Sequence, residues 1–115
     1  MQITKKIIRK YVVLGVRGNL NMNNVHFIKQ IFENEINKGV KFIVIDMKDL
    51  TYIDSSGIGS LINLMSKLRS ISGQICLMNM RQDIERIFSM TKLLSFFKIF
   101  KNEEEFINSL GVQNG

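Results

Sequence analysis

Residues 43–59, IVIDMKDLTYIDSSGIG, contain the pattern that decides the fold. They begin inside the strongest strand candidate of the chain, Val40–Asp46 (VKFIVID), which is apolar on both faces in its middle. Such a run is typical of a central, parallel strand. A connection, Met47–Asp54, then leads into a second helix. The apolar residues of this helix recur at helical spacing over Ile58–Leu68, and Gly73 lies just past the end of the helix.

Upstream of this stretch, the sequence predicts two strands and a helix. Gln2–Ile8 alternates as an edge strand, and Val12–Val16 is a β-branched run that ends near Gly18. Apolar residues then recur at helical spacing over residues 25–36. Asn23 or Asn24 is the expected cap of this helix, and Gly39 its expected end.

Downstream, strand and helix continue to alternate. Gln74–Met78 predicts a short strand, residues 84–88 a helix, and Phe96–Phe100 a last strand. Asn102, with Glu105 three residues on, resembles a capping box that starts a final helix. This order predicts an α/β fold with a mainly parallel sheet of four to five strands and about four helices.

Length and composition predict a single domain spanning residues 1–115, with 45% hydrophobic residues and therefore a real core. No apolar run approaches the roughly 20 residues that cross a bilayer. One cysteine, Cys76, and one histidine, His26, cannot form a disulfide or a typical zinc site, so we expect no metal, no cofactor and a reducing, cytoplasmic location.

The net charge of +6 comes from lysines and arginines spread along the chain without interleaved aromatic residues. This distribution indicates a solvated basic surface or an acidic protein partner rather than direct binding of nucleic acid or a membrane.

Several further side chains have structural interpretations. Cys76 lies between apolar neighbours on a predicted strand, which indicates a buried, inert thiol. Met65 and Met90 are expected to fill the core, although Met80 or Met90 could instead border a partner surface. The expected role of three phenylalanines near the end of the chain is packing between the last strand and helix: Phe96, Phe97 and Phe100.

The candidate functional segment is Asp54–Gly59, where a central strand is followed by a short loop and a helix start. Functional groups gather at such junctions because the helix presents free N–H groups and the positive end of its dipole. Asp54, Ser55 and Ser56 can cap the helix, and that structural role alone would explain them. The glycines Gly57 and Gly59 would leave the first turn bare for the approach of another molecule.

Enzymatic motifs are absent from this segment and from the rest of the chain. Gly57 and Gly59 begin a G-x-G-x-x-G pattern, but position 62 is Ile, so the dinucleotide-binding motif is incomplete. A serine hydrolase would need a histidine base, and His26 is predicted to be a solvated surface residue. We therefore expect no enzymatic activity.

The run from Ile43 to Gly59, centred on Asp-Ser-Ser-Gly-Ile-Gly, resembles the anti-sigma factor antagonist family of STAS domain proteins. The resemblance extends over nearly the whole chain, from the strand ending in Gly18-Asn19-Leu20 to the acidic final helix. It implies a β-α superhelix with a mainly parallel sheet. It also implies a cytoplasmic partner-switching protein that binds an anti-sigma factor, itself a serine kinase, and so frees a sigma factor.

In that family the first serine of the motif accepts phosphate from the kinase, and a PP2C-type phosphatase removes it. The resemblance assigns this role to Ser55 and implies that phosphorylation abolishes binding. The expected partner-binding residues lie in this motif and in the Gly18–Asn24 turn: Asn21, Asp54, Ser55, Ser56, Gly57, Ile58 and Gly59. The alternative is a nonswitching STAS interaction module in a stress-sensing or lipid-transport complex.

Two features depart from the family pattern. Asn21 stands where the family usually has an aspartate that is thought to take part in kinase docking. Asparagine keeps the size but loses the charge, so kinase recognition is expected to differ. The charge of +6 is also unusual, since antagonists of this type are often acidic.

Overall fold

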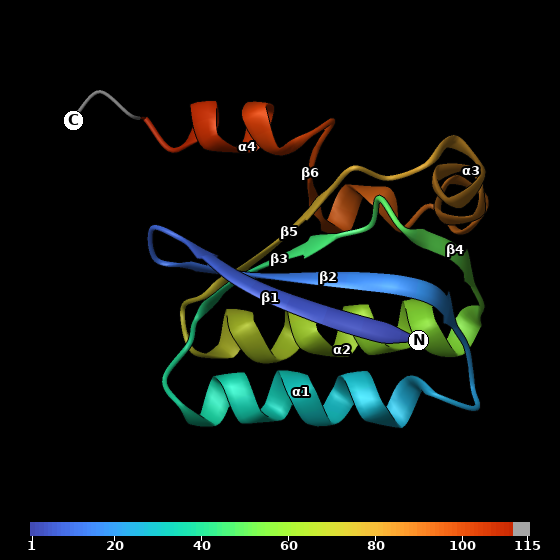
Figure 1. The fold of residues 1–115 in the computed structure, drawn as a ribbon, viewed down its shortest axis with the longest axis horizontal. Coiled ribbons are helices and arrows are strands. Elements are labelled where there is room, and N and C mark those ends of the chain that lie inside the picture. The colour runs from blue at the N-terminus through green and yellow to red at the C-terminus, as the bar shows by residue number, and fades with distance from the viewer. Residues whose placement is uncertain (112–115) are drawn as a thin grey trace.

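The protein is a layered α/β structure in which helices cover both faces of one sheet (Figure 1). The structure, a computed structural model, describes residues 1–111. Its elements in chain order are β1 (Gln2–Ile8), β2 (Tyr11–Leu20), α1 (Val25–Asn37), β3 (Phe42–Asp46), β4 (Leu50–Ile53), α2 (Ser55–Ser70), β5 (Gln74–Met78), α3 (Gln82–Thr91), the 3-10 helix η1 (Leu94–Phe96), β6 (Lys98–Phe100) and α4 (Glu103–Ser109).

The sheet has the order β1-β2-β3-β5-β6, and β4 pairs with the far end of β2. Among residues 1–111, β1 alone is antiparallel to its neighbour, and the other strand pairings are parallel. This confirms the predicted α/β class and mainly parallel sheet. It also means that β2, β3 and β5 all end on one side of the molecule, where the loops that follow them can meet.

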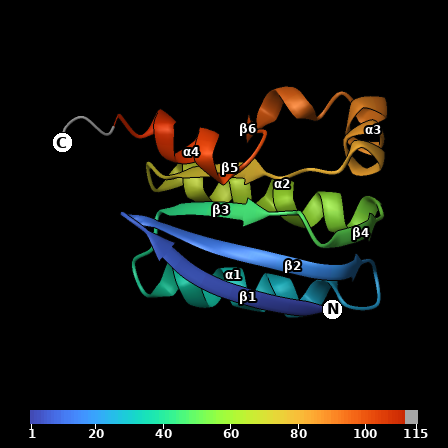
Figure 2. The ribbon, with the colours of Figure 1, turned by 45° about the horizontal axis from the view of Figure 1, so that its top comes forward.

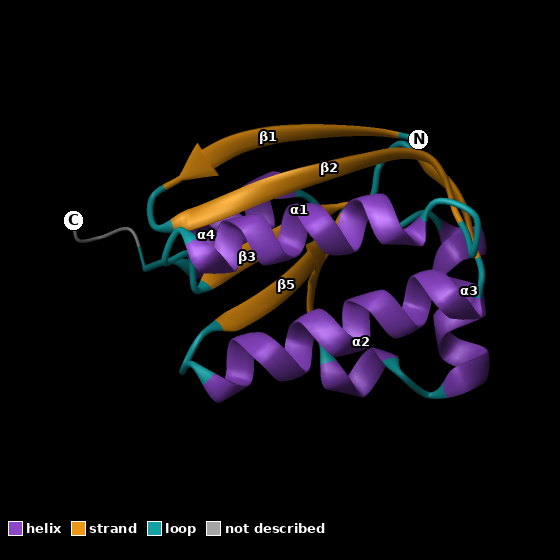
Figure 3. Cartoon of the chain, turned by 90° about the horizontal axis from the view of Figure 1, so that it is seen from below, coloured by secondary structure: helices purple, strands orange, loops and turns teal. Residues whose placement is uncertain are grey.

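The two faces of the sheet have separate cores, as the alternation along β2 dictates. Val12, Leu14 and Val16 point to the face that α1 and α2 cover side by side (Figure 3). Tyr11 and Val13 point to the opposite face, where α4 packs through Phe106. Figure 2 shows α4 and α1 on opposite sides of the sheet.

Strand β4 lies inside the segment that the sequence predicts as a plain connection. Leu50 and Ile53 are buried, whereas Thr51 and Tyr52 between them are exposed. The register between β2 and β4 shifts at Gly18/Asn19, so the strand lacks the simple alternation that identifies strands in a sequence. The prediction of no strand in this connection was therefore wrong.

Other local predictions are partly confirmed. Gly39 follows the end of α1 with a φ of 94°, which favours glycine. Asn24 is the N-cap residue of α1, but its side chain makes no capping hydrogen bond to the helix. The last strand, β6, is shorter than predicted because residues 94–96 form η1.

The buried positions of Met65, Phe97 and Phe100 confirm their predicted packing roles. Met90 and Phe96 do not belong to the core, because their exposed fractions are 81% and 54%.

Candidate functional site

Asp54 starts helix α2 and ties it to the rest of the molecule. Its backbone is extended, and its Oδ1 accepts a 3.0 Å hydrogen bond from the backbone N–H of Gly57. This bond satisfies one of the N–H groups left free in the first turn of a helix. The predicted capping role is thereby confirmed and assigned to Asp54.

The second carboxylate oxygen of Asp54 holds the turn after β2. Its Oδ2 accepts a 3.0 Å hydrogen bond from the N–H of Met22, and the N–H of Asp54 donates to the carbonyl of Leu20 at 3.1 Å. These bonds bring the Gly18–Asn24 turn beside the start of the second helix, so the two segments with the expected partner-binding residues meet.

The turn itself is fixed by asparagine side chains. Asn21 Oδ1 accepts from the N–H of Asn23 at 2.9 Å, and Asn24 Oδ1 accepts from the N–H of Asn21 at 2.9 Å. Asn24 also donates through its Nδ2 to the carbonyl of Asn19 at 2.8 Å. Asn21 is thus half-buried, and its side-chain oxygen serves a local turn.

Ser55 and Ser56 differ in exposure. Ser55, the first residue of α2, is exposed, and Ser56 is half-buried, as expected for a side chain that turns partly toward the protein. Among residues 1–111, neither hydroxyl makes a hydrogen bond to another residue. The Ser55 hydroxyl is therefore available to another molecule.

The two glycines of the motif serve different purposes. Gly57 is buried, and a Cβ built there would lie 2.6 Å from Cγ1 of Ile53 and 2.9 Å from Cγ of Leu20. Its lack of a side chain is required by internal packing, so the expectation that Gly57 leaves room for another molecule is corrected. Gly59 is exposed, and a Cβ there would meet nothing within 4 Å.

Ile58 is also buried, with 5% of its surface exposed, and belongs to the core beneath α2. Gly57 and Ile58 therefore shape the start of the helix from inside. The predicted residues that remain accessible to a partner at this end are Asn21, Asp54, Ser55, Ser56 and Gly59.

Two exposed apolar side chains beside the motif are missed by the sequence analysis. Met22 is 70% exposed on the turn that Asp54 holds, and Tyr52 is 49% exposed on β4, two residues before Asp54. Exposed large apolar side chains next to a free functional group are typical of protein interfaces. Tyr52 could have been found only by recognising β4.

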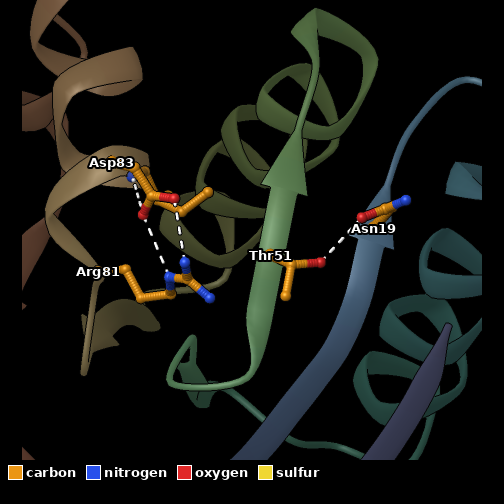
Figure 4. A network of polar contacts seen from close by, with 5 residues as sticks. Asn19, Thr51, Arg81 and Asp83 are labelled. Atoms are coloured by element: carbon orange, nitrogen blue, oxygen red, sulfur yellow. Dashed lines mark hydrogen bonds and ion pairs between the residues drawn. The ribbon is translucent and has the colours of Figure 1, made fainter.

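Polar bonds fix the elements on either side of Tyr52. Thr51 donates through its hydroxyl to Oδ1 of Asn19 at 2.9 Å, which links β4 to β2 (Figure 4). At the start of α3, Arg81 donates from Nε and Nη2 to the two carboxylate oxygens of Asp83, each at 3.2 Å (Figure 4). The first of these bonds joins β4 to β2, whereas the Arg81–Asp83 pair lies within the start of α3.

Within the described part of the chain, no three histidine, cysteine or carboxylate side chains are grouped so as to hold a metal ion. His26 is exposed on α1, as predicted, and its ring lies tilted beside that of Phe27, with 4.1 Å between the centroids. No helix in residues 1–111 is both long and apolar enough to cross a membrane.

Cys76 lies outside the Ser55 site, in the middle of β5. It is 1% exposed, which confirms the predicted buried thiol. Burial raises the pKa of this thiol to about 11, although the charge of Lys98 opposes the shift. The thiol therefore stays protonated and unreactive at neutral pH.

Comparison with known proteins places this geometry in a family. The STAS domain model matches residues 2–106. An anti-sigma factor antagonist homologue of Thermotoga neapolitana is 31% identical over 101 residues, which are 87% of this chain and 89% of that protein.

Solved structures agree with this match. The crystal structure of an anti-sigma factor antagonist from Thermotoga maritima superposes with a TM-score of 0.87 at 29% identity, covering 93% of this chain and 92% of that one. The anti-sigma factor antagonist SpoIIAA in its unphosphorylated form gives a TM-score of 0.75 at 26% identity, covering 96% and 100%. Its phosphorylated form, at 24% identity and a TM-score of 0.73, shares the fold.

One assignment follows from these findings. An exposed serine starts α2, a turn is held against it, and both sequence and structure match known proteins over nearly the full length. The chain belongs to the STAS domain family and is a homologue of the anti-sigma factor antagonists, a family of non-enzymatic regulators.

Proposed function

We propose that this protein is a partner-switching anti-sigma factor antagonist whose switch is Ser55. Unphosphorylated, it binds an anti-sigma factor that is also a serine kinase, and a sigma factor is released. Transfer of the γ-phosphoryl group of ATP to the Ser55 hydroxyl ends the binding, and a PP2C-type phosphatase restores it. The place of action is the cytoplasm.

The observation that carries this proposal is the exposed and unbonded Ser55 hydroxyl at the first residue of α2. A kinase needs access to the oxygen that attacks the phosphoryl group, and a hydroxyl without an intramolecular partner can turn toward it. The existence of SpoIIAA in unphosphorylated and phosphorylated forms supports a switch of this kind in a relative.

The position of Ser55 at a helix start supports the proposal that a phosphate acts on the interface rather than on the fold. A phosphoserine carries about −1.5 to −2 charge at neutral pH. Free N–H groups and the dipole at the start of a helix favour an anion by about 0.3–1 kcal/mol. Burying the same hydrated dianion unpaired against a partner would cost several kcal/mol, which lowers affinity by about a hundredfold or more.

The partner surface that we propose consists of exposed and half-buried residues around this hydroxyl: Asn21, Met22, Tyr52, Asp54, Ser55, Ser56 and Gly59. Gly57 and Ile58 contribute from beneath by setting the position of the first turn. Asn21 is uncharged and hydrogen-bonded within its own turn, so kinase docking here relies less on a carboxylate at this position than in the family pattern.

Phosphorylation with matched serine variants tests this function. The protein is incubated with ATP and each anti-sigma factor kinase encoded near it, and labelled peptides are mapped by mass spectrometry. We expect phosphate on Ser55 only, with labelling lost in Ser55→Ala and retained in Ser56→Ala and in Ser66→Ala, an exposed serine on the same helix. Phosphate on Ser56, or undiminished labelling of Ser55→Ala, would overturn the assignment.

The effect on binding is measured separately with Ser55→Asp. We expect near-normal melting and much weaker binding to the anti-sigma factor in calorimetric titration. A variant that loses affinity only because its melting temperature collapses would contradict an interface mechanism. Binding that persists unchanged in Ser55→Asp and in the phosphorylated protein would favour the nonswitching interaction module.

A further inference from the structure

The end of the molecule opposite Ser55 gathers basic side chains from separate segments. The β1–β2 hairpin turn carries Arg9 and Lys10, Lys38 and Lys41 flank the α1–β3 connection, and Arg69 lies in the last turn of α2. All five are exposed. Figures 1 and 3 show the hairpin and both connections at the same end of the structure.

Strand register explains why these segments meet. Val12 pairs with Ile43, and Ile43 pairs with Ile75, so the residues just before β2, β3 and β5 lie in line. Contacts across this line agree: the N–H of Gln74 donates to the carbonyl of Lys41 at 2.9 Å, and Lys10 Nζ lies 4.1 Å from the ring centroid of Phe42. We call the set Arg9, Lys10, Lys38, Lys41 and Arg69 the basic end.

Little of this charge is neutralised within the chain. Arg9, Lys10, Lys41 and Arg69 make no ion pair with any other residue in the range 1–111. Lys38 lies 3.6 Å from Glu35, but that carboxylate is buried and already 3.0 Å from Lys5. Neither the hairpin turn nor the connections 38–41 and 71–73 contain an acidic residue.

Five of the ten acidic side chains lie at the Ser55 end. Asp46 ends β3, Asp49 and Asp54 flank β4, and Asp83 and Glu85 lie in the first turn of α3. The other five are Glu33 and Glu35 on α1 and Glu103, Glu104 and Glu105 in the first turn of α4. The positive charge of the basic end therefore lies away from the proposed partner surface. The proposed anti-sigma factor surface does not account for it.

We propose that the basic end binds the surface of an anionic lipid bilayer. Its cations come from loops and helix ends arranged across one end of the molecule, which suits a broad, diffuse negative surface. An apolar side chain, Ile7, is 67% exposed beside the hairpin turn. An isolated apolar group next to cations suits the boundary between lipid headgroups and acyl chains.

A hollow at the basic end fits a single headgroup. It measures about 260 Å³ and is lined by Arg9, Lys10, Tyr11 and Leu110. Two cations over an aromatic and an aliphatic floor can receive a phosphate together with the first carbons of a lipid. Nucleic acid binding would be favoured by exposed aromatic rings for base stacking, and Phe42 beneath Lys10 is instead half-buried.

The proposed contact is peripheral, reversible and sensitive to salt. Each lysine or arginine held near an anionic bilayer improves partitioning about fivefold, and the gain fades beyond a Debye length. Docking through this end would leave Ser55 facing away from the bilayer. The proposal revises the sequence-based expectation of no membrane contact and is independent of the switch at Ser55.

Vesicle flotation of the full chain tests the proposal. We expect binding to vesicles rich in phosphatidylglycerol, none to phosphatidylcholine alone, and release at about 0.5 M salt. Arg9→Gln with Lys10→Gln should weaken binding about thirtyfold, as should Lys41→Gln with Arg69→Gln. The control, Lys29→Gln with Arg86→Gln, removes the same charge from exposed sites on α1 and α3 and should stay within about threefold.

Three results would overturn the proposal. Equal weakening by the control would mean that overall charge, rather than the basic end, drives the binding. Failure to float with anionic vesicles, combined with binding of poly-glutamate that requires Arg9 and Lys10, would identify an acidic protein as the occupant. Failure to float, combined with binding of a short DNA duplex that requires Arg9 and Lys10, would identify a nucleic acid as the occupant. Ser55→Ala should bind vesicles normally, which separates this test from that of the switch.

Discussion

Asp54 Oδ2 accepts a 3.0 Å hydrogen bond from the backbone N–H of Met22, a residue 32 positions earlier in the chain. The other oxygen of the same carboxylate caps helix α2 at Gly57. One side chain therefore fixes both the start of the helix that carries Ser55 and the turn that presents Met22. The spacing of the proposed partner surface depends on this carboxylate.

Replacing Asp54 should loosen both segments. We expect Asp54→Ala to lower the free energy of unfolding by about 2 kcal/mol, because a helix cap and a charged hydrogen bond are lost together. Asp54→Asn should cost less, since its oxygen can still accept from Gly57. Urea unfolding measures both.

The control is Asp49→Ala, which removes an exposed carboxylate with no side-chain bond to any other described residue. Its unfolding free energy should change by less than about 0.5 kcal/mol. Equal losses in Asp49→Ala and Asp54→Ala would show that Asp54 matters only through its charge.

The two motif glycines should respond oppositely to substitution. Gly57→Ala places a methyl group within 2.6 Å of Ile53 and should destabilise the protein by about 1–3 kcal/mol. Gly59→Ala meets open space in an exposed helix position, so it should be neutral or stabilising by up to about 1 kcal/mol. Thermal or urea unfolding of Gly57→Ala and Gly59→Ala measures both changes in stability.

Gly59→Arg is consequently the better probe of the partner surface. It should leave the melting temperature near that of the wild type and still weaken binding of the anti-sigma factor. Gly57→Arg would lose binding through damage to the fold. Wild-type affinity in a well-folded Gly59→Arg would place the interface elsewhere.

Met22 and Tyr52 should contribute apolar contact area to the partner. We expect Met22→Ala and Tyr52→Ala each to weaken anti-sigma factor binding about tenfold, since exposed aromatic and methionine side chains are frequent anchors of interfaces. The melting temperature should barely change in Met22→Ala, whose side chain is 70% exposed, and should change little in Tyr52→Ala, whose side chain is about half exposed. Ile7→Ala, which removes a similarly exposed side chain at the opposite end, is the matched control and should bind normally.

Cys76 should make the protein less stable in alkali. Burial raises the pKa of its thiol from 9.0 to about 11, so between these values the unfolded chain loses a proton that the folded chain keeps. The stabilisation is fully present below pH 9 and is lost as the pH rises to 11, by on the order of 2 kcal/mol.

Urea unfolding across this pH range should show the loss in the wild type and a smaller slope in Cys76→Ala, whose overall stability is lower because of the cavity. Parallel slopes would mean that the thiol titrates in the folded state as it does in the unfolded one. In addition, the native thiol should react with a disulfide reagent far more slowly than after unfolding.

The sequence by itself determined the elements whose burial repeats locally. The all-apolar middle of β3, the helical spacing of α1 and α2, and Gly39 at a positive φ are each visible within one segment, and the structure agrees with them. The position of Asp54 before α2 likewise predicts a cap without knowledge of the fold. These features follow from backbone periodicity and from the free N–H groups at helix starts.

Tertiary structure alone decided what depends on contacts between distant segments. Strand β4 exists because Leu50 and Ile53 pack inward and pair with β2, although its exposed middle hides it in the sequence. Gly57 is required because Leu20 and Ile53 close over it. Basic residues that are dispersed along the chain meet at one end because the register of β2, β3 and β5 aligns the loops that precede these strands. No pattern within a single segment of the sequence predicts that alignment.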